Sequence, residues 1–202
     1  MTDQARFEAA IQAFDEANRQ DPSAEWVDGK PYPKEWWYAQ ELTRWVRRLR
    51  PEASEALLLA ARCQHIERWK IPREEYPMDR TGYLTWRKTL AKFHARRAGE
   101  ILKELGYPES FVRRVQELNL KEDIKRDPET QTLEDALCLT FLQRQFHDFA
   151  RRTNEEKMVG IIRKTWKKMS PLARQIALQL DFDSASQALV QKALAESEPP
   201  AR

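Results

Sequence analysis

Two histidines and one acidic pair are the residues of this sequence best suited to acid–base chemistry or metal ligation: His65, His94, Glu134 and Asp135. His65 ends an apolar helical run, residues 60–66, and His94 lies at helical spacing within a second such run. Because a buried imidazole needs a polar partner, we expect the four side chains to meet around a ligand. The alternative is that each histidine is a core residue whose hydrogen bonds are satisfied locally.

The acidic pair has two interpretations. If Thr132 caps a helix over residues 133–152, Glu134 and Asp135 lie in its first turn, where carboxylates favour the helix dipole and Asp135 completes a capping box. The apolar neighbours Leu133 and Leu137 would instead make this an unfavourable place for two carboxylates unless a cation faces them. On that interpretation, His65, His94 and Asp135 are candidate ligands of a divalent metal.

A loop rich in arginine and aromatic residues follows His65 directly. Forked guanidinium donors beside flat aromatic faces suit a nucleotide or another phosphorylated ligand. The candidate ligand-binding residues are Arg62, Arg68, Trp69, Arg73, Tyr76, Arg80 and Arg87. The alternative is a solvated loop in which arginine stems cover tryptophan and pair with glutamates.

The composition limits the class of protein. The net charge of +3 is the difference between 35 basic and 32 acidic residues, so bulk charge does not predict a nucleic-acid binder, and a small ligand is favoured over nucleic acid as partner. Five glycines and 33% charged residues argue against a parallel sheet with glycine-rich phosphate loops. Two cysteines without zinc-finger spacing, no apolar run of membrane-spanning length and no signal-like N-terminus predict a cytoplasmic protein that does not enter membranes.

The elements that must position these residues are helices. Hydrophobic periodicity and cap residues predict an all-α fold without a β-hairpin. The expected helices cover residues 3–19, about 33–50, 51–71, 80–105 after the cap Asp79, about 108–120, 133–152, 155–169 after the cap Asn154, and two short segments opened by Ser170 and Ser184. We expect a single domain over residues 1–196 and a disordered tail over residues 197–202.

Two family resemblances follow from these motifs. The order Ala-Ala-x-x-x-His-Ile, His-x-x-x-Ala-Gly-Glu-Ile-Leu and Glu-Asp-Ala-x-x-Leu resembles a degenerate HD-domain phosphohydrolase core over about residues 36–145. The resemblance implies an HD-like core of five to six helices, about residues 33–152, with additional N-terminal helices and a C-terminal helical extension over residues 153–196. It also implies one or two divalent metals that activate water. Gln64-His65 stands where that family has His-Asp, and Tyr38-Ala39-Gln40 stands where it has its first histidine.

A longer resemblance covers nearly the whole chain. The segments Gln64-His65-Ile66-x-Arg68-Trp69-x-Ile71-Pro72-Arg73, Tyr76-Pro77-Met78-Asp79-Arg80 and Lys164-Thr165-Trp166-Lys167-Lys168-Met169-Ser170 are similar to the domain-of-unknown-function family 4202. That family implies no activity.

The leading hypothesis is an HD-like protein that binds a phosphorylated small molecule or nucleotide. Arg68, Arg73, Arg80 and Arg87 would clamp the anion and Trp69 or Tyr76 would stack on it. The histidines and the acidic pair would hold a divalent metal or move protons, which makes metal-dependent phosphoester hydrolysis the reaction to test first. The alternative is a non-catalytic module of degenerate HD-like fold that docks protein or RNA.

Overall fold

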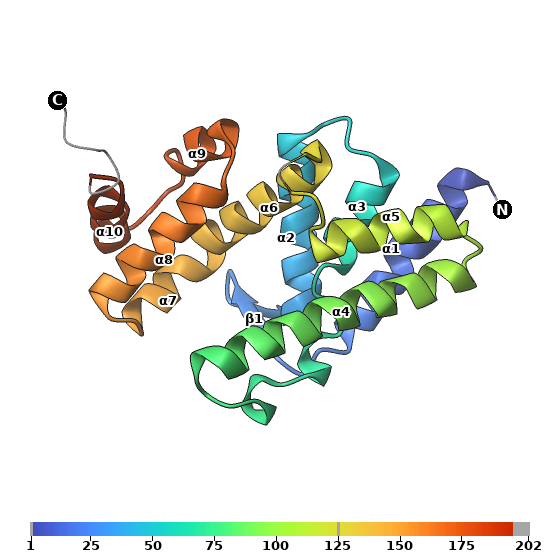
Figure 1. Cartoon of the computed structure of the whole chain (residues 1–202), viewed down its shortest axis with the longest axis horizontal. Coiled ribbons are helices and arrows are strands. Elements are labelled where there is room, and N and C mark those ends of the chain that lie inside the picture. The colour runs from blue at the N-terminus through green and yellow to red at the C-terminus, as the bar shows by residue number, and fades with distance from the viewer. Residues whose placement is uncertain (1, 125, 196–202) are drawn as a thin grey trace. The chain divides into compact units, whose positions relative to one another are not determined.

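The computed structural model describes residues 2–124 and 126–195, and the described chain is built almost entirely of helices (Figure 1). This confirms the all-α fold class. The chain divides into two compact units, Met1–Leu133 and Glu134–Arg202. The boundary falls inside the segment that the sequence predicts as the HD-like core, and that core stays a prediction.

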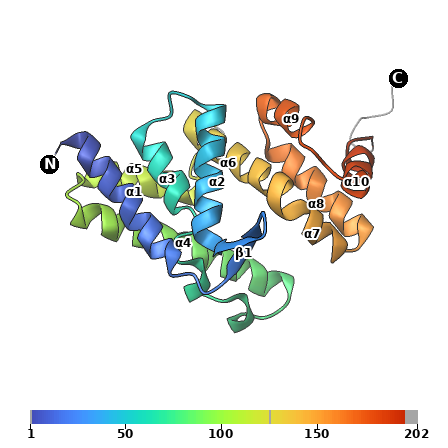
Figure 2. The same cartoon turned by 180° about the vertical axis from the view of Figure 1, so that it is seen from behind.

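The first unit is a helical assembly with one small hairpin. Its elements are α1 (Asp3–Arg19), β1 (Ala24–Val27), β2 (Lys30–Pro33), α2 (Lys34–Leu49), α3 (Glu55–Cys63), the short 3-10 helices η1 (Arg68–Lys70) and η2 (Arg73–Glu75), α4 (Arg80–Glu104), α5 (Glu109–Leu120) and the start of α6 (Pro128–Thr140). Helix α4 packs along α5, α3 packs between α2 and α5, and α1 crosses α2 and α3 (Figures 1 and 2). The core between them contains Phe14, Leu42, Leu57, Leu59, Leu90, Leu102 and Leu118.

Several predicted helix ends are confirmed by their cap geometry. The Asp79 side chain accepts a hydrogen bond from the backbone N–H of Gly82, and α4 begins at the next residue, Arg80. Gly106 follows α4 with a φ of +78°, in the left-handed region where glycine carries no steric penalty. Thr2 caps α1 in the same way as Asp79 caps α4.

The expectation that the chain has no hairpin is wrong. Strands β1 and β2 pair in antiparallel register, with Val27 opposite Lys30, and the two-residue turn Asp28-Gly29 has positive φ at both positions. An Asp-Gly pair between two short strands is the usual signal for this turn, and the sequence analysis missed it.

The helix that carries the first histidine is shorter than predicted. Ser54, not Pro51, opens it, because its hydroxyl accepts from the N–H of Leu57, and it ends at Cys63 instead of continuing to residue 71. Glu67 adopts a left-handed φ of +52°, and its N–H donates to the side chain of Asn18 in α1. His65 therefore lies in the turn after α3, where the chain changes direction.

The helix that carries the acidic pair starts earlier than predicted. Helix α6 begins at Pro128, so Thr132 is not its cap, and the Thr132 hydroxyl donates to the carbonyl of Pro128 one turn back. Glu134 and Asp135 consequently lie in the middle of α6, outside its first turn, and the capping-box interpretation is wrong.

The second unit contains the remaining helices. It comprises the end of α6, the π-helical segment η3 (Phe141–Gln145), α7 (Phe146–Arg151), α8 (Glu155–Lys168), α9 (Pro171–Ala177) and α10 (Ser184–Ala195). Asn154 and Ser170 cap α8 and α9 as predicted. Helix α8 packs against α10, and Phe146, Met158 and Ile162 are buried in this unit. The predicted disordered tail lies outside the described residues.

Candidate functional site

His65 is surrounded by polar and aromatic side chains from three parts of the first unit. Its ring stacks on Tyr38 of α2, with centroids 4.4 Å apart and planes inclined by 11°. Its Nδ1 lies 3.3 Å from Oε2 of Glu35, in the first turn of α2. The side chain keeps 24% of its surface exposed. We call Glu35, Tyr38, His65, Arg68 and His94 the His65 cluster.

Glu35 is the buried carboxylate of this cluster. Its backbone N–H donates to Oδ2 of Asp21, which fixes the start of α2. Burial raises the pKa of the Glu35 carboxyl, while the charges of Arg68 and Lys34 act against that shift. Arg68 is the closer cation, with its Nε 3.8 Å from Oε1 of Glu35.

His94 lies behind His65, with the two ring centroids 5.8 Å apart. Its Nδ1 is 2.8 Å from the carbonyl oxygen of Ile66. Because a carbonyl oxygen only accepts, Nδ1 carries the hydrogen and Nε2 is the bare nitrogen. Nε2 is buried without a hydrogen-bond partner among the described residues. Burial, and then the charge of His65, lowers the pKa of His94 to about 3, so this imidazole is neutral near pH 7.

Several cations act on His65, although the Glu35 carboxylate lies 3.3 Å from its Nδ1. Burial lowers the pKa of His65 well below 6.5, and the charges of Arg68, Arg87, Lys121 and Lys34 lower it further. Each of these cations disfavours a proton on His65 because like charges repel. The same field would favour an anion placed beside the ring.

Arg68 is held in place by an aromatic ring. Its guanidinium lies over Trp86 of α4, 4.8 Å from the ring centroid. The indole N–H of Trp86 donates to the carbonyl of Ile71 at 2.9 Å, which fixes the ring. Burial lowers the pKa of Arg68, and the charge of Glu35 raises it.

Two of the predicted ligand-binding arginines hold the fold together. Arg62 is buried in a double ion pair with Asp15 of α1, with N–O distances of 2.6 and 2.8 Å. Arg73 donates to the carbonyls of Tyr76, Pro77 and Asp79 and so fixes the loop before α4. Their donors serve these contacts, and neither residue belongs to the His65 cluster.

The remaining predicted ligand-binding residues lie around the loop and the start of α4. Trp69 and Tyr76 are half-buried, whereas Arg80 and Arg87 are exposed. Nη1 of Arg87 lies 3.3 Å from the hydroxyl of Tyr83, one turn earlier on α4. Of this predicted set, Arg68 and Arg87 are the two whose charges act on His65.

The acidic pair has partners within the second unit. Oε1 of Glu134 lies 3.1 Å from Nζ of Lys168 at the end of α8. Oδ1 of Asp135 accepts from the backbone N–H of Ser170, the cap of α9, at 2.8 Å. The structure therefore brings His65 and His94 together and assigns the two carboxylates contacts that join α6 to the α8–α9 connection.

Glu35 is the site residue that the sequence analysis missed. Its signal was present in the sequence, because the apolar stripe Tyr38, Leu42, Trp45 and Leu49 extends back by one helical step to position 35. A carboxylate on the buried stripe of a helix is unusual without a partner, and here the partners are His65 and Arg68.

The residues of the first unit do not fit a divalent metal. No group of three or more His, Cys, Asp or Glu side chains in the described chain is arranged to hold one. The charges that lower the pKa of His65 would also repel a metal cation. Asp135 belongs to the second unit, so the metal set His65, His94 and Asp135 stays a prediction.

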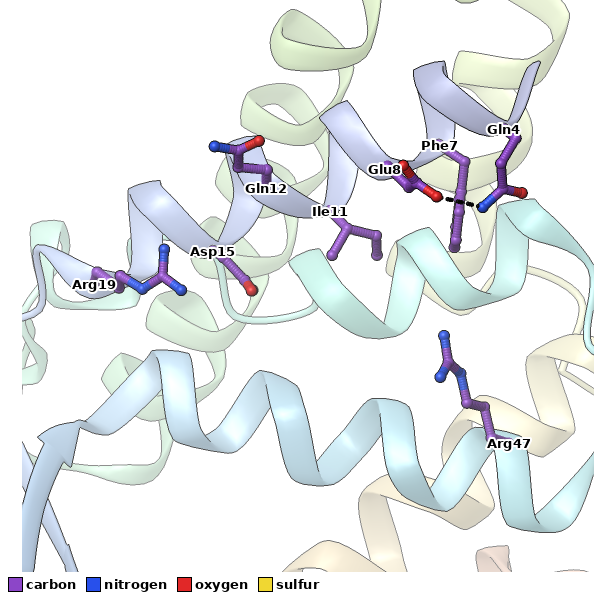
Figure 3. A pocket seen from close by; sticks show the side chains of 8 residues that line it. All are labelled: Gln4, Phe7, Glu8, Ile11, Gln12, Asp15, Arg19 and Arg47. Atoms are coloured by element: carbon purple, nitrogen blue, oxygen red, sulfur yellow. Dashed lines mark hydrogen bonds between the residues drawn. The ribbon is translucent and has the colours of Figure 1, made fainter. Parts of the chain in front are cut away.

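A groove of about 430 Å³ lies elsewhere on the first unit, along α1 and beside Arg47 of α2. In Figure 3, Phe7 and Ile11 extend from α1 towards the neighbouring helices, and Arg47 rises from α2. The two polar contacts at its ends are already made within the protein, since Gln4 donates to Glu8 and Asp15 pairs with Arg62. This groove does not include any residue of the His65 cluster.

Fold and site together define an all-α protein in which a buried carboxylate and two neutral histidines lie beside an arginine–tryptophan stack. The chain belongs to the family described as "Domain of unknown function (DUF4202)", whose model matches residues 8–190. This confirms the longer of the two resemblances. Comparisons with curated proteins and with solved structures found no match. No helix of the described residues is long and apolar enough to cross a membrane.

Proposed function

We propose that the His65 cluster binds the phosphate group of a phosphorylated small molecule. The observation that carries this proposal is the placement of the Arg68 guanidinium, held over Trp86 and 3.8 Å from Glu35, in the cluster that contains the partly exposed imidazole of His65. The charges of Arg68, Arg87, Lys121 and Lys34 all act on that imidazole. Such a concentration of positive charge lowers the energy of a bound anion, and the partly buried surroundings screen it less than bulk water would.

The donors for the phosphate are the guanidinium groups of Arg68 and Arg87. A guanidinium has five N–H donors in a fixed plane, which matches two oxygens of one phosphate. Arg68 is oriented by its stack on Trp86, and Arg87 by its contact with Tyr83. Because both side chains are already ordered, little rotational entropy is lost when the anion binds.

His65 supplies the proton-transfer chemistry of the proposed site. It is neutral near pH 7, and a phosphate bound beside it would raise its pKa by offsetting the surrounding cations. Nδ1 of His65 faces Oε2 of Glu35 at 3.3 Å, so Nε2 is the nitrogen that we assign to contact with the ligand. This arrangement supports hydrolysis of a phosphate ester as the reaction to test, with His65 moving the proton.

The test is a calorimetric titration of the full chain with inorganic phosphate and with a simple phosphate monoester. We expect Arg68→Ala to weaken binding about tenfold or more, because charge-assisted hydrogen bonds to phosphate contribute on the order of 1.5–3 kcal/mol. Arg113→Ala on α5 is the matched control, since it removes the same charge from an exposed position outside the cluster. Equal losses in the two variants would contradict the proposal, because they would show only a bulk charge effect.

Catalysis and metal binding are separated by two further measurements. Release of phosphate from the monoester, lost in His65→Ala, would support hydrolysis, whereas binding without turnover would support the alternative of a non-catalytic binding module. Elemental analysis of the purified protein determines whether it contains a bound metal. Stoichiometric metal that disappears when both His65 and His94 are replaced by alanine would support the predicted metal site and contradict a phosphate site that works without metal.

A further inference from the structure

One face of α4 leads from solvent to the His65 cluster. Tyr83, Arg87, Leu90 and His94 follow one another at spacings of four, three and four residues, so they lie along one side of the helix. The exposure falls along this face, from 43% at Tyr83 to 2% at His94. A ligand whose phosphate binds Arg87 and Arg68 therefore has Tyr83 on its solvent side.

Tyr83 presents an aromatic ring whose surroundings hold it in place. Its ring centroid lies 6.0 Å from that of Trp86, and its hydroxyl lies 3.3 Å from Nη1 of Arg87. Trp86 in turn carries the guanidinium of Arg68, the other proposed phosphate ligand, 4.8 Å from its ring centroid. The exposed ring is thus adjacent to both guanidinium groups that would hold the anion.

We propose that the ligand is a nucleoside monophosphate whose base stacks on Tyr83 while its phosphate binds Arg68 and Arg87. The inference rests on the function proposed above and names the class of ligand. An exposed aromatic ring beside paired guanidiniums suits a flat, apolar group joined to an anion, because each part of the ligand finds its own partner.

The stacking residue differs from the two that the sequence suggested. Trp69 and Tyr76 are half-buried, and the Tyr76 carbonyl is part of the loop held by Arg73. Tyr83 is more exposed and lies on the face of α4 that carries Arg87. Its position one turn before Arg87 places the base near the phosphate without any movement of the backbone.

The experiment compares three ligands on the full chain: adenosine 5′-monophosphate, ribose 5-phosphate and inorganic phosphate. We expect the nucleotide to bind about tenfold more tightly than ribose 5-phosphate, the effect of stacking one base. Tyr83→Ala should abolish that difference, while its affinity for inorganic phosphate should equal that of Tyr83→Phe, which also lacks the hydroxyl that contacts Arg87. Tyr83→Phe keeps the ring and should retain the difference, and Leu84→Ala, an exposed neighbour, serves as the control.

The outcomes separate this inference from the proposed function. Equal affinities for the nucleotide and ribose 5-phosphate in the wild type would overturn the nucleoside assignment but leave phosphate binding intact. A nucleotide preference that survives in Tyr83→Ala would overturn the role of Tyr83. Failure of all three ligands to bind the wild type would overturn both proposals.

Discussion

Glu35 controls the charge balance of the His65 cluster, because it is a buried carboxylate in direct contact with both His65 and Arg68. Replacing it by glutamine keeps the shape and removes a negative charge that would repel a bound phosphate. We expect Glu35→Gln to tighten phosphate binding by roughly 1 kcal/mol, measured by calorimetry. Glu74→Gln, which removes a charge from the exposed η2 segment, should leave the affinity unchanged. Weaker binding in Glu35→Gln would show that the carboxylate is needed to position the donors.

His94 should make the protein sensitive to acid. Its pKa is about 3 in the folded state and 6.5 when unperturbed, so the unfolded chain takes up the proton first as the pH falls. The stability is therefore fully present above about pH 6.5 and declines as the pH falls towards 3, by about 2 kcal/mol between pH 7 and pH 5 from this residue. Urea unfolding at the two pH values measures it. In His94→Gln, which can still donate to the Ile66 carbonyl, the pH-dependent loss should be smaller by that amount.

At the residue scale, the sequence identified polar side chains that lie in buried positions, but it predicted only some of the contacts that they make. The approach of His65 and His94 was expected from their positions on apolar helical runs. The role of Arg62 was not, because its partner Asp15 is 47 residues away and no local pattern links them. Glu134 and Asp135 were placed in the first turn of a helix expected to start at residue 133, whereas that helix starts at Pro128.

Among the elements of the first unit, the loop before α4 packs so closely against the helix that it requires glycine at position 82. A Cβ there would lie 2.0 Å from the backbone oxygen of Pro77, which cannot rotate away as a side chain would. We expect Gly82→Ala to displace the loop held by Arg73, lower the melting temperature and increase proteolysis within residues 72–79. Gly160→Ala is the control, because a Cβ on α8 meets no atom within 4 Å and should stabilise its helix slightly. An unchanged cleavage pattern in Gly82→Ala would contradict the close packing.

The sequence predicted the start of a helix correctly where a cap side chain bonds to the first turn of that helix. Asp79, Asn154 and Ser170 each accept hydrogen bonds from N–H groups two or three residues ahead, so short-range patterns identified them. The end of α3 has no such local cap: the chain turns after Cys63, and four residues later the N–H of Glu67 donates to Asn18 of α1. A contact between residues 49 positions apart leaves no signal in either segment.

At the scale of the whole molecule, the first unit is held together by polar contacts as well as by its apolar core. Asp15 of α1 pairs with Arg62 of α3, Gln40 of α2 donates to the same carboxylate, and the Arg62 guanidinium also reaches the hydroxyl of Thr43. Three helices thus meet at one buried ion pair. This placement explains why Arg62, on an otherwise apolar helix, is tolerated in the core.

A double-mutant cycle on this pair tests whether Arg62 is part of the fold and not of the ligand site. Removing one partner leaves a buried charge uncompensated, so Arg62→Met and Asp15→Leu should each lower the free energy of unfolding by about 3–5 kcal/mol. The double variant removes both charges and should lose much less than the two singles combined, because the apolar side chains can pack against each other. Chemical denaturation of the four proteins measures the coupling, and phosphate affinity of the folded double variant should match the wild type. Additive losses of stability would contradict the coupling of the pair. A phosphate affinity that falls when Arg62 is replaced would show that this arginine belongs to the binding site.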